Sequence, residues 1–243
     1  MRPILDGVFD LTRLGAFASA PGPKGVTVSF GLWLPNISDG FLVEALVIHA
    51  DDRFVEDVPS IAIELTHDSD DFWTGSYTIA TQRGTSFGKK GRYLYRYRLS
   101  RVTTGKTTVL SNSVADPFAT QTDDVGQFSA FETPGTTSGH RWTDDNWRVP
   151  CVEDLIVYEL DVEEFNGTFD GVVDRLGYLQ SLGVNCLELM PVTSLRVDFD
   201  WGYSPLNFFA PNERWGGAPG LKRLVNECHN REIAVILDVV YYS

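Results

Sequence analysis

The stretch "DLIVYELDVEEFNGTFDGVVDRLGYLQSLGVNCLELMPV" (154–192) decides the fold. It contains a short apolar strand at 155–160, an amphipathic helix through 168–183, and a second apolar strand at 184–192 that Pro191 ends. A strand, a helix and a strand in this order predict two parallel strands joined by a crossover helix, because parallel neighbours need a long connection.

The predicted helix has an apolar stripe and signals at both of its ends. Gly183 stands where a helix-terminating glycine is expected. The preceding "NGT" (166–168) has the pattern of a glycosylation acceptor, but we expect it to cap the helix, because the N-terminus lacks a secretory signal. The stripe that we expect to face the sheet consists of Val172, Val173, Leu176, Leu179 and Leu182.

The same alternation continues to the last residue. "APGLKRLVNECHNR" (218–231) predicts a second helix, and "IAVILDVVY" (233–241) predicts a third buried strand. Three parallel strands with two helices can begin a doubly wound sheet or a (β/α)8 barrel, which needs about 250 residues of its own. The inward positions of this second helix are Leu221, Leu224, Val225 and Cys228.

The first half of the chain has a strand pattern instead. Apolar and polar residues alternate in "GVTVSFGLWLP" (25–35) and "GRYLYRYRLS" (91–100), and "RLSRVTTGKTTVLSN" (98–112) reads as a hairpin. Many short strands separated by turn residues predict a β-sandwich. We therefore expect a sandwich over residues 1–135, a linker at 136–153 and an α/β domain over 154–243.

Composition excludes several classes of function. The net charge is −13 and the isoelectric point is about 4.6, which disfavours nucleic acids and anionic membranes as partners. No apolar run reaches the roughly 18 residues of a membrane span, and without a secretory signal we expect a cytoplasmic protein. The cysteines Cys151, Cys186 and Cys228 lack metal-site or disulfide spacing, so we expect buried reduced thiols, no metal and no cofactor.

Four segments together resemble one enzyme family. They are residues 154–192, "DWGYSPLNFFAPNERWGG" (200–217), "GLKRLV" (220–225) and "VILDVVY" (235–241), in this order and spacing. The chain resembles the α-amylase family of glycoside hydrolases (family 13), in its multidomain members: branching enzymes, debranching enzymes and the trehalose-releasing hydrolase of maltooligosyl-trehalose. The resemblance implies the first three βα units of a (β/α)8 TIM barrel, preceded by an immunoglobulin-like sandwich similar to a carbohydrate-binding module of family 48.

The resemblance implies an α-glucan substrate such as starch, glycogen or a maltooligosaccharide. It also implies a retaining mechanism, in which two carboxyl groups lie about 5–5.5 Å apart. The family's three catalytic carboxylates follow strands four, five and seven of the barrel, so we assign no catalytic residue and expect the chain alone to be inactive.

Three residues match substrate-side positions of the family. Tyr203 corresponds to a tyrosine that stacks on the sugar, Trp201 stands next to that sugar, and Asp238 matches the aspartate of the third strand. All three lie beyond the carboxyl ends of predicted parallel strands, where barrel sites are built. The alternatives are loop packing for the two aromatic residues and a buried, hydrogen-bonded acid for Asp238.

The end of the sequence departs from the family pattern. The family's third-strand motif reads Asp-Val-Val-Tyr-Asn-His, whereas this chain has Tyr242 and Ser243 at the last two positions. We therefore interpret the sequence as truncated within the barrel.

A second function remains open, a non-catalytic module that binds α-glucans. Its candidate platforms are Trp33, Trp73 and Tyr97 in the predicted sandwich. The competing interpretation places these aromatic side chains in the core, which large aromatic residues usually dominate.

Overall fold

The computed structural model describes residues 11–37, 40–68, 71–125, 127–195 and 200–241. Tyr242 and Ser243, at which the sequence departs from the family motif, lie outside these residues. Within the described residues no helix is long and apolar enough to cross a membrane.

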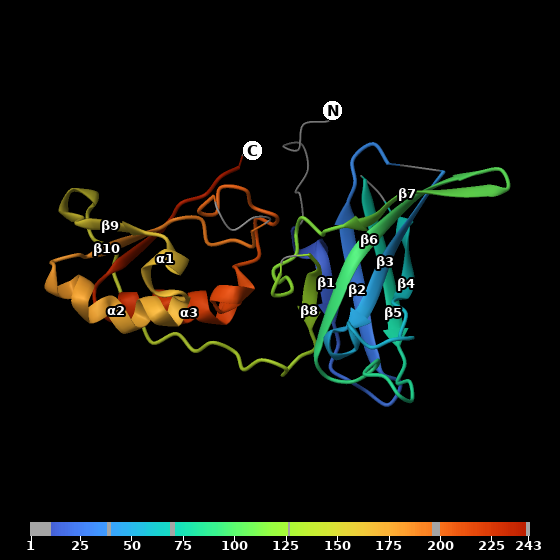
Figure 1. The fold of residues 1–243 in the computed structure, drawn as a ribbon, viewed down its shortest axis with the longest axis horizontal. Coiled ribbons are helices and arrows are strands. Elements are labelled where there is room, and N and C mark those ends of the chain that lie inside the picture. The colour runs from blue at the N-terminus through green and yellow to red at the C-terminus, as the bar shows by residue number, and fades with distance from the viewer. Residues whose placement is uncertain (1–10, 38–39, 69–70, 126, 196–199, 242–243) are drawn as a thin grey trace. The chain divides into compact units, whose positions relative to one another are not determined.

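The chain divides into two compact units (Figure 1). The first comprises Met1–Ala119 with Phe128–Thr137, and the second comprises Thr120–Gln127 with Ser138–Ser243. Residues 120–127 belong to the second unit, although nothing in the local sequence pattern indicates this assignment. The domain boundaries at residues 135 and 153 stay predictions.

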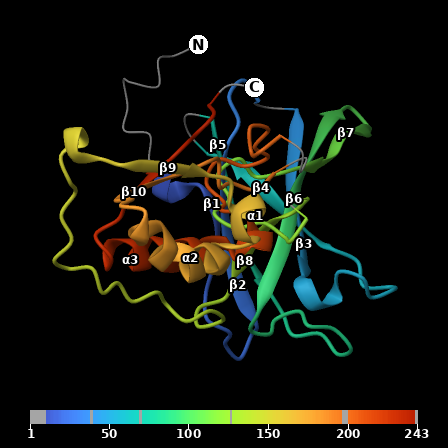
Figure 2. The same cartoon turned by 60° about the vertical axis from the view of Figure 1, so that its left-hand side comes forward.

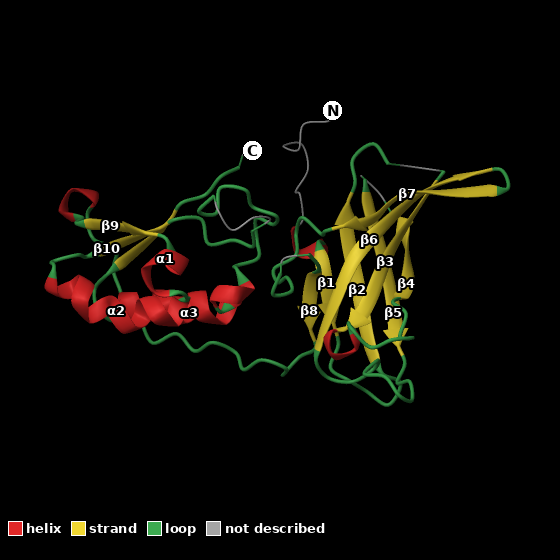
Figure 3. Ribbon diagram, in the orientation of Figure 1, coloured by secondary structure: helices red, strands yellow, loops and turns green. Residues whose placement is uncertain are grey.

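Antiparallel strands build the first unit, with two short 3-10 helices at Leu11–Arg13 and Ala50–Asp52 (Figure 3). The strand order is β1-β2-β5-β4-β3-β6-β7, and β8 pairs with β6. The predicted strands at 25–35 and 91–100 and the predicted hairpin are confirmed as β2, β6 and the β6–β7 turn. The strands are β1 (Gly15–Ala18), β2 (Val26–Trp33), β3 (Phe41–His49), β4 (Ile61–His67), β5 (Phe72–Ile79), β6 (Arg92–Thr103), β7 (Lys106–Val114) and β8 (Ser129–Glu132).

The sheet of the first unit folds back on itself. Along the sheet, β5, β4 and β3 separate β2 from β6. Nevertheless the ring of Phe30 on β2 lies 5.3 Å from the ring of Tyr95 on β6 and 6.1 Å from that of Phe131 on β8. Two distant parts of the sheet must therefore face each other across a shared apolar core.

This core contains two of the aromatic residues considered for glucan binding. Trp73 is 4% exposed and Tyr97 is 2% exposed, and Trp33 is partly buried. The interpretation of Trp73 and Tyr97 as core residues is confirmed. They offer no free face to a sugar, so a glucan-binding role for the first unit cannot rest on them.

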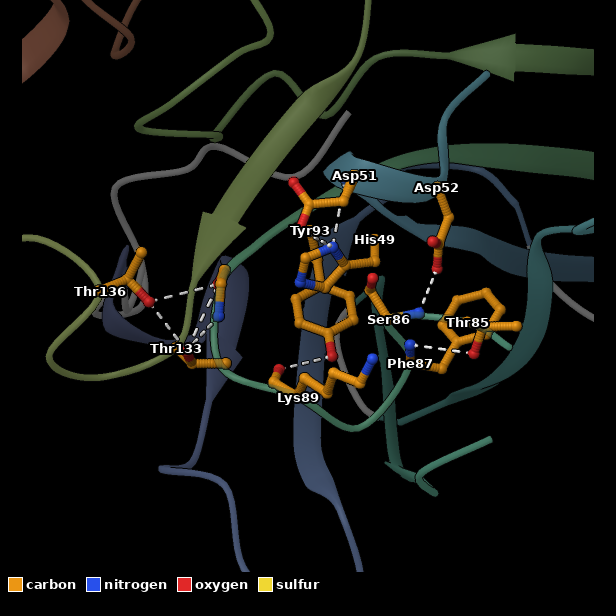
Figure 4. A network of polar contacts seen from close by, with 11 residues as sticks. His49, Asp51, Asp52, Thr85, Ser86, Phe87, Lys89, Tyr93, Thr133 and Thr136 are labelled. Atoms are coloured by element: carbon orange, nitrogen blue, oxygen red, sulfur yellow. Dashed lines mark hydrogen bonds and ion pairs between the residues drawn. The ribbon is translucent and has the colours of Figure 1, made fainter. Parts of the chain in front are cut away.

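A network of polar contacts holds the loop between β5 and β6 against the end of β3 (Figure 4). The amide of Ser86 donates to Asp52 Oδ2 (2.6 Å), and Tyr93 Oη donates to the carbonyl of Lys89 (2.9 Å). Gly91 packs so tightly on His49 that an added Cβ would lie 2.4 Å from Nε2 of the imidazole. A side chain at position 91 would therefore push His49 out of its buried place.

The second unit contains a parallel sheet of three described strands (Figure 2). The order β11-β10-β9 and the parallel pairing confirm the prediction made from the β–α–β pattern. The elements are a 3-10 helix (Val152–Asp154), β9 (Val157–Leu160), α1 (Val162–Asn166), α2 (Phe169–Ser181), β10 (Cys186–Leu189), a second 3-10 helix (Glu213–Trp215), α3 (Gly217–His229) and β11 (Ala234–Leu237).

Helices α2 and α3 pack on one face of this sheet. Leu160, Leu187 and Leu189 from the strands join fully buried helix residues in one apolar cluster. Each such leucine contributes about 1.5–3 kcal/mol when it is removed from water. The helix residues of the cluster include Phe169, Val172, Leu176 and Leu179 from α2, and Leu224 and Cys228 from α3.

The structure confirms the predicted capping signals at both ends of α2. One residue of the predicted apolar stripe is exposed instead of buried. Thr168 Oγ1 accepts the amide of Gly171 (3.0 Å), so "NGT" caps the helix as expected. Gly183 has φ +82° and donates to the carbonyl of Gln180 (2.9 Å), as a helix-terminating glycine does. Leu182 is 52% exposed, because it lies after the last helical turn, where the periodicity no longer directs side chains to the sheet.

The described part of α3 differs from its predicted stripe at one position. Leu224 and Cys228 are fully buried, but Val225 is half-buried and Asn226 is buried in its place. All three cysteines are free thiols, and Cys151 is exposed, contrary to the expectation that all would be buried.

Candidate functional site

A tight turn after β10 presents two of the predicted substrate residues. The amide of Tyr203 donates to the carbonyl of Asp200 (3.1 Å), and between them Trp201 and Gly202 both have left-handed backbones, with φ of +53° and +93°. Gly202 lies against the chain that leaves β10, since an added Cβ would be 2.5 Å from the carbonyl oxygen of Pro191. The glycine is therefore required both by the backbone angle and by the close approach.

Tyr203 and Asp238 meet beyond the carboxyl ends of the strands. Tyr203 Oη donates a hydrogen bond to Asp238 Oδ2 (2.6 Å). The amide of Asp238 donates to the carbonyl of Leu189 (2.9 Å), which extends the β10–β11 pairing by one residue and holds the carboxylate at the sheet edge. The structure thus brings together two residues that are 35 positions apart in the sequence.

The hydrogen bond to Asp238 raises the pKa of Tyr203 to about 12, with smaller contributions from burial and from nearby carboxylates. Because the folded-state pKa lies above the ordinary value of 10, the stabilising effect of this bond is present below pH 10 and is lost as the pH rises through about 12. At neutral pH the phenol is therefore a hydrogen-bond donor with a fixed acceptor, and its ring is left partly exposed.

Trp201 has a different partner from the other two residues. Its indole Nε1 donates to Glu164 Oε1 (2.9 Å) on the short helix α1. Asp161 accepts the amide of Glu164 (2.8 Å) and caps the start of that helix. About half of the Trp201 side chain is exposed, so it still offers an apolar surface to a ligand.

Two glutamates lie on the sheet face opposite the helices. Glu159 on β9 is paired with Glu188 on β10, so their side chains point to the same face. Both carboxylates help to raise the pKa of Tyr203. The sequence analysis did not include these two acids among the candidate site residues. The signal that could have indicated them is a single glutamate at the equivalent position of each apolar strand.

This arrangement suits a neutral hydroxylated ligand. Carboxylates accept hydrogen bonds from sugar hydroxyl groups, and exposed aromatic rings pack on the apolar faces of sugars. Among the described residues no group of histidine, cysteine or acidic side chains has the geometry of a metal site.

A second polar cluster attaches the segment that precedes β9 to helix α3. His229 Nδ1 and Asp144 Oδ2 are 2.6 Å apart, and the ring of Trp147 stacks on the imidazole with centroids 4.5 Å apart. The buried Asn226 accepts the amide of Thr143 (2.7 Å), which explains a polar residue on the inner side of α3. Residues 143–147 therefore lie on α3 through side-chain contacts.

We expect acid to loosen this segment first. The hydrogen bond from His229 lowers the pKa of Asp144, so the contact is stabilising above the ordinary carboxyl range and is lost as the pH falls through the lowered pKa, below about pH 4. Amide resonances of Thr143 and Trp147, followed from pH 6 to pH 2, should shift before those of α2. In Asp144→Asn this early step should be absent, and a simultaneous shift of all resonances in the wild type would contradict the prediction.

Comparison with known proteins decides the family. Residues 112–242 match the family described as the catalytic domain of alpha amylase, which is more than half of the chain. The chain belongs to the α-amylase family.

The curated relatives are much longer than this chain. The chain is 39% identical over 134 residues to a malto-oligosyltrehalose trehalohydrolase of Saccharolobus solfataricus, covering 54% of this chain and 23% of that protein. It is 36% identical over 126 residues to a 1,4-alpha-glucan branching enzyme of Xanthomonas campestris, covering 44% of this chain and 17% of that protein. The chain thus spans about a fifth of the length of these relatives.

Solved structures in the family have the same fold over nearly the whole chain. A pullulanase of Anoxybacillus sp. LM18-11, crystallised with maltotriose, aligns with a TM-score of 0.62 at 20% sequence identity. The alignment covers 95% of this chain and 34% of the pullulanase chain. At this identity the similarity establishes the fold alone.

Proposed function

We propose that the chain supplies part of the substrate-binding site of an α-glucan-active glycoside hydrolase or transglycosylase. The observation that carries this proposal is the 2.6 Å hydrogen bond between Tyr203 and Asp238. It joins an aromatic ring and a carboxylate at the carboxyl ends of parallel strands, which is the end of a barrel where substrates bind. Trp201, which belongs to the same turn as Tyr203, adds a second apolar face to this binding surface.

The finer architecture that we propose is the start of a (β/α)8 barrel after an immunoglobulin-like sandwich. The parallel order β9, β10, β11, with helices on one face, supports the barrel. In a barrel the opposite face, which carries Glu159 and Glu188, points to the interior. The folded-back antiparallel sheet of the first unit supports the sandwich.

The named relatives support an α-glucan as the substrate class. One is a trehalohydrolase of malto-oligosyltrehalose, one is a branching enzyme of 1,4-alpha-glucan, and one structural neighbour holds maltotriose. Retaining hydrolysis needs a carboxylate nucleophile and a carboxylic acid about 5–5.5 Å apart. We assign neither role to an acid of this chain, and we propose that the 243 residues alone bind glucan without cleaving it.

The test is a titration of the chain with maltoheptaose, followed by amide resonances in the described part of the second unit. We expect shifts at Trp201, Tyr203 and Asp238. Tyr203→Ala should weaken binding about tenfold, because it removes both the ring and the hydroxyl group. Tyr203→Phe, which keeps the ring and loses only the donor to Asp238, should weaken it less.

The matched control is Tyr178→Ala, which removes a 54% exposed tyrosine from helix α2. Its binding should equal that of the wild type. The same samples, incubated with soluble starch, should release no reducing sugar. The proposed substrate site would be refuted if Tyr203 and Asp238 show no shifts, or if the shifts are unchanged in Tyr203→Ala. Release of reducing sugar would refute the proposed inactivity.

A further inference from the structure

Helix α1 (Figure 1) holds two indole groups of the segment that connects β10 to α3. The adjacent residues Glu163 and Glu164 each accept a hydrogen bond from one of them. Trp201 Nε1 donates to Glu164 Oε1 (2.9 Å), and Trp215 Nε1 donates to Glu163 Oε2 (3.3 Å). The partners are 37 and 52 positions apart in the sequence. Two neighbouring carboxylates therefore attach one connecting segment to the same helix at two places.

The two indole groups lie in different surroundings. Trp215 is 3% exposed, and its ring lies edge-on to that of Phe169 with centroids 6.1 Å apart. It belongs to the apolar cluster of the second unit, so packing as well as the hydrogen bond holds it. Trp201 is 53% exposed. Packing restricts it less, so its orientation depends more strongly on the hydrogen bond to Glu164.

The backbone of Trp201 adds to this dependence. Its φ of +53° lies in the left-handed region, which bulky residues rarely occupy because Cβ crowds the following carbonyl oxygen. Residues in this region persist where the surrounding contacts hold them, and they are frequent at ligand sites. Glu164 supplies one such contact through the indole. The hydrogen bond from the amide of Tyr203 to the carbonyl of Asp200 supplies another through the backbone of the turn.

Glu164 is itself held in place by the packing of α1. Val162 is 1% exposed within the apolar cluster, and the ring of Phe165 lies edge-on to that of Tyr158 on β9, with centroids 6.0 Å apart. Asp161 Oδ1 accepts the amide of Glu164 (2.8 Å) at the start of the helix. These contacts fix the backbone at Glu164, so its carboxylate meets the turn from an anchored element.

The turn after β10 thus presents two aromatic side chains, each attached to a carboxylate of another element. Tyr203 donates to Asp238 after β11, and Trp201 donates to Glu164 on α1. Hydrogen bonds to a carboxylate are stronger than those between neutral groups. Both side chains keep exposed surface, 36% for Tyr203 and 53% for Trp201. Each aromatic side chain of the proposed substrate site is therefore oriented by its own acid.

We propose that Glu164 is a positioning residue of the substrate site, which holds the indole of Trp201 in the orientation that packs against a sugar. The ligand class, an α-glucan, rests on the proposed function. The role of Glu164 rests on its hydrogen bond, on the left-handed backbone of Trp201 and on the anchored helix. A ring that is ordered before binding loses fewer rotamers when the glucan binds, which increases the affinity. Glu164 acts through Trp201 and not through contact with the sugar.

The first measurement follows the indole Nε1–H resonances of the full chain without ligand. The chain contains six tryptophans, and the resonance that is lost in Trp201→Phe belongs to Trp201. We expect this resonance to move upfield in Glu164→Ala, because a proton that donates to a carboxylate is deshielded. Glu164→Gln keeps a carbonyl oxygen as the acceptor and should keep the resonance near its wild-type position. An unchanged resonance in Glu164→Ala would overturn the positioning role.

The second measurement is the affinity for maltoheptaose, followed at the amide of Asp238. We expect binding to be about threefold to tenfold weaker in Glu164→Ala and at most about twofold weaker in Glu164→Gln. In the Trp201→Phe background, Glu164→Ala should weaken binding no further, because phenylalanine has no N–H group to donate. A loss that persists in this background would show that Glu164 acts without Trp201, and it would overturn the positioning role.

The matched control is Asp174→Ala, which removes an exposed acid from helix α2. Its affinity for maltoheptaose should equal that of the wild type. Glu164 is also exposed, so the helical circular dichroism of its two variants should be unchanged.

The outcomes separate this inference from the proposed function. Wild-type affinity in Glu164→Ala, with shifts still present at Tyr203 and Asp238, would overturn the inference and leave the proposed function standing. The absence of shifts in the wild type would refute the proposed substrate site and, with it, the role of Glu164 in binding. Weaker binding in Glu164→Ala that Glu164→Gln restores, and that disappears in the Trp201→Phe background, would support both.

Discussion

Asp116→Ala should lower the free energy of unfolding of the first unit by about 3–5 kcal/mol. The carboxylate is fully buried. Its Oδ2 accepts hydrogen bonds from the hydroxyl groups of Tyr95 (2.6 Å) and Tyr97 (3.3 Å), and its Oδ1 accepts the amide of Phe118 (2.9 Å). Burial raises the pKa of both phenols well above their ordinary value, so they remain donors, and alanine would remove the carboxylate that both donate to inside the core.

Guanidinium unfolding, followed by the near-ultraviolet circular dichroism of the buried tyrosines, measures this loss. The loss of stability in Asp116→Asn should be intermediate. The amide keeps one carbonyl oxygen as an acceptor, but its NH₂ group faces hydroxyl and amide groups that are themselves donors. The control Glu56→Ala removes an exposed acid of the same unit and should change the stability by no more than about 0.5 kcal/mol. A loss below about 1 kcal/mol in Asp116→Ala would show that the network stabilises little.

Gly202→Ala should weaken glucan binding at the proposed substrate site at least about tenfold while α2 and α3 remain folded. Gly202 has φ +93°, where an alanine costs about 1–2 kcal/mol, and the new Cβ would meet the carbonyl oxygen of Pro191 at 2.5 Å. The contact is with backbone, so the turn must move. The hydroxyl group of Tyr203 then moves out of hydrogen-bonding distance of Asp238, and Trp201 moves with the turn.

We expect maltoheptaose to bind at least about tenfold more weakly to Gly202→Ala, measured by the amide shifts at Asp238. The helical circular dichroism signal should equal that of the wild type. The control is Gly177→Ala in α2, where an added Cβ meets nothing within 4 Å. That variant should bind normally and gain about 0.5–1 kcal/mol of stability, since alanine favours a helix over glycine. Normal binding by Gly202→Ala would show that the turn geometry is not needed.

Local pattern predicted the elements of the second unit well. The 3.6-residue period, the capping threonine and Gly183 are all contained within one helix, and they predicted α2 with both of its ends. Within α2 the predicted stripe was wrong only at Leu182, which lies beyond the last turn. Asn226 could not be predicted as buried, because its partner Thr143 is 83 residues away.

The candidate substrate site was predicted in part. The resemblance grouped Trp201, Tyr203 and Asp238, and the structure joins the last two while it pairs Trp201 with Glu164. Glu159 and Glu188 were not predicted as part of the site, because each reads as one polar residue in an apolar strand. Only the pairing of β9 with β10 places both on one face of the sheet.

By itself the sequence determined the family, the parallel β–α–β order of the second unit and the antiparallel strands of the first. These features depend on periodicity and turn residues, whose physical causes act over a few residues. The tertiary structure alone decided the acceptors of Tyr203 and Trp201 and the buried site of Asp116. Each of these depends on register and on contacts between segments far apart in the chain, and one residue of slip in a strand would turn every side chain to the other face.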